Sequence, residues 1–139
     1  MRVGVADRAG VADSALLALL AFDGFLTVVL AALFLPTYIG SVAFPISALV
    51  CGVVNVALVV AAALVTDRNT MTCLPLVGWG FGFFVCLFGG PGGDVILGQS
   101  WQTVLLLFLG VVPAGYALYR IELNRARAKQ LSRQTSPAA

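Results

Sequence analysis

The chain is short, apolar and sparsely charged. It has 139 residues, of which 60% are hydrophobic and 10% are charged, and its mean hydropathy is +1.02. Because soluble domains carry about 25% charged residues, 8 basic and 6 acidic side chains cannot cover the surface of a water-soluble fold of this length. The chain has no histidine, which excludes the commonest general base and the usual nitrogen ligand of zinc and haem.

The first apolar stretch covers residues 15–35 and predicts a transmembrane helix. A helix rises about 1.5 Å per residue, so a stretch of this length spans the roughly 30 Å hydrocarbon core of a bilayer. Asp23 is the only ionisable residue within it. Residues 1–14 precede it as a short segment of mixed charge, and Asp13 or Ser14 is expected to cap the helix.

Three further apolar stretches follow, and short connections separate them. They predict transmembrane helices at residues 45–65, 73–89 and 101–119. Pro36 ends the first helix, Pro45 suits the first turn of the second, and Pro113 is expected to kink the fourth. The sequence therefore predicts an all-α fold, a four-helix transmembrane bundle that crosses the membrane of a bacterial cell in multiple passes.

Small residues mark the helix faces that are expected to pack against other helices. In lipid, small residues let helix backbones approach closely. On the second helix, Ser47 and Cys51 share one face with Asn55, and Gly52 adjoins it. On the third helix, the spacing of Gly78 and Gly82 gives one smooth face. The predicted packing residues are Ser47, Cys51, Gly52, Gly78 and Gly82.

The three cysteines are Cys51, Cys73 and Cys86, an odd number without CxxC spacing. They are interpreted as small buried apolar residues. A bridge between Cys51 and Cys86 is sterically conceivable at a shared depth, but nothing in the spacing requires one.

Charge distribution predicts the orientation of the chain. All 8 Lys and Arg residues fall within residues 1–14, 66–72 and 120–139, on one side of a four-span arrangement. By the positive-inside rule, both termini are cytoplasmic. Residues 120–139 form a basic cytoplasmic tail, expected to be partly disordered beyond about Leu131. Its lipid- or partner-facing basic residues are predicted to be Arg120, Arg125, Arg127 and Lys129.

Asp23 and Asn55 form the candidate intramembrane polar site. A charge near the centre of a transmembrane helix costs about 2.5 to 3.5 kcal/mol, so Asp23 must face other helices or water, or be protonated. Asn55 lies at a comparable depth on the second helix, and we expect a hydrogen bond between the two side chains.

No group of residues predicts catalysis. The chain has no Ser/His/Asp set, no metal-ligand cluster and no second membrane carboxylate to pair with Asp23. The Gly/Pro-rich segment 89–94 lacks the Lys and Ser/Thr of a phosphate-binding loop. We therefore expect a protein that is not an enzyme, with no catalytic residue, no metal, no cofactor and no nucleic-acid partner.

Two functional hypotheses follow from these observations, and a third concerns the tail. The first is an accessory or assembly subunit of a larger membrane complex, because the loops are short and small residues line helix faces. The alternative is a small homo-oligomeric transporter coupled to protons or cations through Asp23. Small multidrug transporters share the chain length and the position of a helix-one acid, but they use Glu and have other glycine and aromatic patterns. A lipid-binding regulator acting through the basic tail is the third.

The chain resembles a group of small, uncharacterised four-span membrane proteins of actinobacteria. The residues that carry the resemblance lie in three segments, 36–47, 74–79 and 89–101, together with Asn55. They include Pro36-Thr37-Tyr38, Leu74-Pro75 with Trp79, and Gly89-Gly90-Pro91-Gly92-Gly93-Asp94 before Trp101. The resemblance implies a four-helix integral membrane protein and assigns no activity to any residue.

Overall fold

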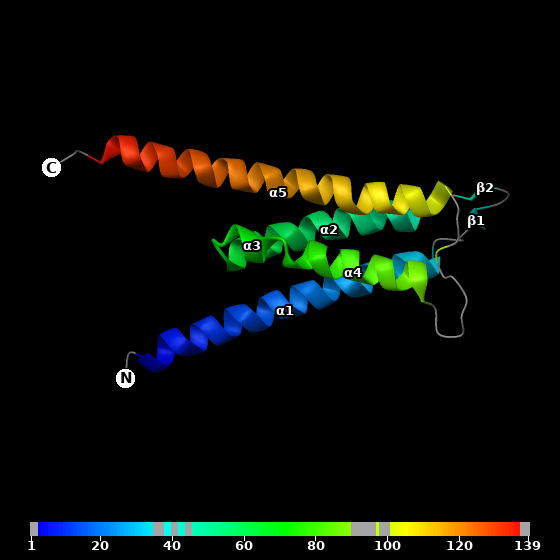
Figure 1. Cartoon of the computed structure of the whole chain (residues 1–139), viewed down its shortest axis with the longest axis horizontal. Coiled ribbons are helices and arrows are strands. Elements are labelled where there is room, and N and C mark those ends of the chain that lie inside the picture. Colours follow the sequence, from blue (N-terminus) through cyan, green and yellow to red (C-terminus); the bar gives the residue numbers. More distant parts are fainter. Residues whose placement is uncertain are drawn as a thin grey trace.

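The computed structural model describes residues 3–34, 38–39, 42–43, 46–89, 97 and 101–136 (Figure 1). It is helical, as predicted, apart from one pair of two-residue strands. The elements in chain order are α1 (Val3–Phe34), β1 (Tyr38–Ile39), β2 (Val42–Ala43), α2 (Ile46–Val65), α3 (Asn69–Thr72), α4 (Leu74–Phe88) and α5 (Trp101–Thr135).

Three of the helices within the described part are long and apolar enough to cross a membrane. They are α1 over Arg8–Phe34, α2 over Ile46–Val65, and α5. The fourth apolar helix, α4, has 15 residues, which corresponds to about 22 Å and is shorter than the roughly 30 Å hydrocarbon core. The length and composition of the three long helices support a membrane protein.

The four main helices lie side by side along one axis (Figure 1). Helix α1 packs chiefly against α4, and α2 packs chiefly against α5, while α1–α2 and α2–α4 contacts are smaller. Both ends of the chain and α3 lie at one end of the bundle, and β1 and β2 lie at the other (Figure 1). The strands pair antiparallel, with Tyr38 opposite Ala43 and Ile39 opposite Val42.

Glycines bring α1 and α4 into close backbone contact. A Cβ atom on Gly78 would overlap the carbonyl oxygen of Ala21, and one on Gly24 would overlap that of Pro75. Gly82 of α4 faces Phe25 and Val28 of α1. Gly78 and Gly82 thus lie against α1, and Gly24 on α1 complements them.

Two helix ends differ from the sequence-based expectation. Helix α1 begins at Val3 rather than near residue 15, because no proline interrupts residues 3–14. Gly4 and Gly10 lie within this segment without ending the helix. Ser14 does not cap a helix: its hydroxyl donates to the Gly10 carbonyl at 2.9 Å, a bond typical of serine inside a helix. Helix α5 continues to Thr135, so the disorder expected beyond Leu131 is not found up to that residue.

Candidate functional site

Asp23 lies on α1 as a half-buried residue without a polar partner. Within the described residues, its carboxylate makes no hydrogen bond or ion pair. Its backbone carbonyl accepts a hydrogen bond from the Thr27 hydroxyl at 2.7 Å, a local contact one helical turn away. The side chain lies on the flank of α1, away from the line of buried residues Gly24, Val28 and Ala31.

Asn55 on α2 is buried, with 2% of its surface exposed, and faces α5. Its Nδ2 group donates to the Gly110 carbonyl at 3.0 Å, and its Oδ1 atom has no hydrogen-bond partner. The expected hydrogen bond between Asp23 and Asn55 is therefore wrong. Two residues at the same depth in the membrane need not contact each other. The face of α2 that carries Asn55 packs against α5, whereas Asp23 lies on α1, which packs chiefly against α4.

The contact between α2 and α5 is shaped by Pro113. Proline has no N–H group, so the Leu109 carbonyl four residues earlier has no intrahelical donor from this position. Pro113 lies inside α5 without ending it. The Leu109 carbonyl lies against Gly52 of α2, where a Cβ atom would overlap it. In membrane helices, a neighbouring helix commonly accommodates a proline-interrupted turn, and here Gly52 and Asn55 lie beside it.

Trp79 joins three helices in the core. It is 1% exposed, and its Nε1 group donates to the Cys51 sulfur on α2 at 3.0 Å. Its ring stacks on Phe83 with centroids 5.4 Å apart, and Gly110 of α5 lies against the ring. Cys51, Cys73 and Cys86 are all free thiols, so the conceivable bridge between Cys51 and Cys86 is not formed.

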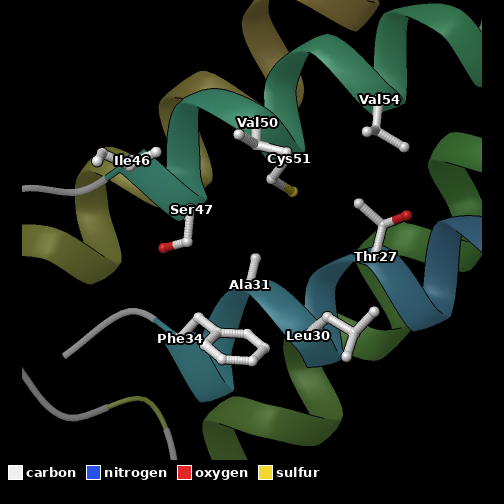
Figure 2. Close-up of a pocket in the computed structure, with 9 residues that line it drawn as sticks. All are labelled: Thr27, Leu30, Ala31, Phe34, Ile46, Ser47, Val50, Cys51 and Val54. Atoms are coloured by element: carbon white, nitrogen blue, oxygen red, sulfur yellow. The ribbon is translucent and has the colours of Figure 1, made fainter. Parts of the chain in front are cut away.

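An apolar groove lies between α1 and α2, next to their Phe34 and Ile46 ends (Figure 2). Its volume is about 540 Å³. Among the described residues, the lining comes from these two helices and consists of Thr27, Leu30, Ala31, Phe34, Ile46, Ser47, Val50, Cys51 and Val54. The Ser47 hydroxyl oxygen is buried and has no hydrogen-bond partner.

Arg125 has a role that the sequence analysis missed. Its guanidinium donates to the Ala63 carbonyl at 3.0 Å, in the last turn of α2, and to the Thr66 carbonyl at 2.7 Å, directly after the helix. It also donates to Asn69 Oδ1 at 3.1 Å and to Thr72 Oγ1 at 3.2 Å. The last carbonyls of a helix lack intrahelical donors, and Arg125 supplies them from α5. Arg125 thus binds within the chain, a role that was not predicted, while contact of its exposed part with lipid or a partner stays a prediction.

The other basic residues of the predicted tail are exposed. Arg120 lies over the Tyr116 ring, 5.9 Å from its centroid, and donates to the Tyr116 hydroxyl at 3.3 Å. Arg127 and Lys129 are exposed residues of α5. The C-terminal part of this helix extends past α2 and α4 (Figure 1). Only the position of Arg125, level with the end of α2, distinguishes it from these neighbours.

The Gly/Pro-rich segment belongs almost entirely to the part of the chain outside the described residues. Residues 90–94 are among these. Gly89 follows the end of α4, and the Leu97 N–H donates to the Cys86 carbonyl at 3.3 Å. Leu97 is buried in the core beside Cys86.

The described residues hold no cluster of three or more His, Cys, Asp or Glu side chains. The length and composition of the described helices define a helical protein of the membrane type. The Asp23 carboxyl group and the buried Asn55 amide lie on different helices and face different neighbours. No protein-family model, no curated protein and no solved structure matches the chain. The resemblance to actinobacterial four-span proteins stays a prediction.

Proposed function

We propose that the chain spans the bacterial cytoplasmic membrane four times, with both termini in the cytoplasm. Arg68 precedes α3 at the end of the bundle where both termini lie, and the basic residues of α5 extend from the same end (Figure 1). The distribution of basic residues then satisfies the positive-inside rule. Helix α4 is the short span, and α3 directly precedes it on the cytoplasmic side.

Within that membrane, the protein acts as a non-enzymatic accessory or assembly subunit of a larger complex. The observation that carries this proposal is Asp23, which has no polar partner within the described residues. Leaving a charge among lipid chains costs about 2.5 to 3.5 kcal/mol. A polar or basic group on a neighbouring subunit removes this penalty, so the Asp23 face of α1 is the proposed contact with another chain.

The experiment compares Asp23→Asn with Asp23→Leu. The protein is extracted into nanodiscs, and native mass spectrometry measures the mass of the intact assembly. We expect the wild type and Asp23→Asn to retain a second subunit, because Asn still hydrogen-bonds, and Asp23→Leu to lose it. Leu33→Ala, a change at an exposed apolar residue of the same helix, is the control and should retain it. A wild-type protein that is monomeric, or an Asp23→Leu variant that keeps the subunit, contradicts the proposal.

The alternative function is a small homo-oligomeric transporter coupled to protons or cations through Asp23. One observation favours it: Thr27, one helical turn from Asp23, lines the groove between α1 and α2. Here Asp23→Asn should abolish uptake of protons into proteoliposomes under an imposed pH gradient, read with an enclosed pH dye, while the assembly persists. Unchanged proton uptake would exclude this alternative.

A further inference from the structure

The groove between α1 and α2 follows the direction of the two helices. On α1 its lining extends from Phe34 back to Thr27, and on α2 from Ile46 forward to Val54. At 1.5 Å per residue, these stretches are about 10 to 12 Å long. Phe34 and Ile46 are helix ends, so the groove begins near the membrane surface and ends close to the midplane of a hydrocarbon core about 30 Å thick.

The rim of the groove faces outward. Leu30, Phe34, Ile46 and Val50 are all exposed residues, whereas Ala31 and Cys51 belong to the buried core beneath them. None of the lining side chains that the structure describes is charged, and the Cys51 sulfur accepts a hydrogen bond from the indole N–H of Trp79. Figure 2 shows the groove between the two ribbons, with Ala31 and Cys51 directed toward one another. The lining therefore offers apolar contact and no recognition of a charged group.

The volume and width of the groove favour a thin apolar ligand over a helix. The volume of about 540 Å³ lies in the range of about 300 to 1,000 Å³ that is usual for small-molecule sites. An α-helix with side chains is about 10 to 12 Å wide, too wide to enter a groove between two helices that are themselves in contact. A hydrocarbon chain is thinner than a helix and runs along the membrane normal, as the groove does.

We propose that the groove binds one acyl chain of a bilayer phospholipid, from the leaflet at the Phe34 end. This inference rests on the proposed membrane orientation, but not on the proposed role of Asp23. Dispersion contacts with the lining residues hold the chain, because each atom pair contributes little and many act together. The bound chain closes the outer part of the α1–α2 interface, where the groove separates the two helices.

Trp79 reports on the groove because it is buried directly behind Cys51. The protein is reconstituted into vesicles of phosphatidylcholine with bromine atoms at the middle of one acyl chain, which quench indole fluorescence on close approach. Trp101→Phe leaves Trp79 as the single indole, because the chain has 2 tryptophans. We expect bromine to quench Trp79 although it is 1% exposed.

Two valines on α2 provide a matched pair of variants. Val50 lines the groove and is 53% exposed, whereas Val60 is 42% exposed and lines no part of it. In the Trp101→Phe background, Val50→Phe should reduce the quenching of Trp79 at least about two-fold by filling the groove, and Val60→Phe should leave it unchanged. Both substitutions are at the outer surface, so the fold should be retained.

Other results of the quenching experiment would contradict the proposal or the membrane placement on which it rests. Equal quenching in the two valine variants overturns the groove as the site. Quenching that appears only at high lipid-to-protein ratio means that a second copy fills the groove at low ratio, and this also overturns the proposal. The wild-type protein, which keeps the exposed Trp101, checks insertion. Quenching in the wild type but not in Trp101→Phe contradicts the groove alone, and quenching in neither protein contradicts the membrane placement.

Discussion

At the scale of single residues, two polar side chains bind backbone carbonyls of a neighbouring helix or its end. Asn55 binds the carbonyl of Gly110, and Arg125 binds two carbonyls at the end of α2. The Asn55 amide donates to a carbonyl near Pro113 in α5, and the Arg125 guanidinium donates to carbonyls at the end of α2, where intrahelical donors are missing. The Asp23 carboxylate, by contrast, has no polar contact within the described residues, and the buried Ser47 hydroxyl has none either.

Arg125 is expected to stabilise the fold. Arg125→Ala removes four hydrogen bonds from a charged group, and such bonds contribute about 1.5 to 3 kcal/mol each at most. Because the site is half-exposed, we expect a loss of about 2 kcal/mol in the free energy of unfolding, measured by denaturation in mixed micelles. Arg127→Ala, at an exposed position two residues on, should change it by less than about 0.5 kcal/mol.

Arg125→Lys refines this prediction. Lysine keeps the charge but lacks the planar fork that reaches several acceptors at once. An intermediate loss of stability is expected. If Arg125→Ala and Arg127→Ala have the same free energy of unfolding, the hydrogen bonds of Arg125 do not stabilise the fold and the prediction is wrong.

At the scale of the helices, glycine contacts position α1 against α4. Gly78→Ala places a methyl group on the Ala21 carbonyl, whereas Gly80 of the same helix has nothing within 4 Å of an added Cβ. Overpacking costs about 1 to 3 kcal/mol, so Gly78→Ala should lower the free energy of unfolding by that amount. Gly80→Ala should be neutral or slightly stabilising, because alanine favours helix. The same denaturation experiment compares the two, and equal stabilities would contradict close packing at Gly78.

Sequence reasoning predicted the helices better than their ends and contacts. The spans follow from uninterrupted apolar runs, and the spacing of Gly78 and Gly82 indicated a packing face. The helix ends at Val3 and Thr135 were missed because a polar segment that contains no proline can continue a helix beyond the apolar run. The partner of Asn55 was missed because depth along a helix does not say which neighbour a face meets. Arg125 was missed because five basic residues near one helix end look alike in sequence.

At the scale of the whole molecule, the orientation can be tested with the native cysteines. Cys73 is half-buried between α3 and α4, whereas Cys51 and Cys86 are buried. A membrane-impermeant maleimide should therefore label Cys73 alone, in inside-out vesicles and not in right-side-out ones. Cys73→Ser is the control and should abolish the labelling. Labelling restricted to right-side-out vesicles would place the termini outside the cell.

The pairing of helices also has a consequence for how the chain is made. The most extensive contacts join α1 to α4 and α2 to α5. The main packing partner of each of the first two helices is therefore synthesised after it. The bond from Asn55 to Gly110 joins residues 55 positions apart. Until α5 is inserted, the Asn55 amide and the carbonyls later bound by Arg125 face the translocation machinery, lipid or water. We therefore expect the packing of the four main helices to be completed only when α5 is in place.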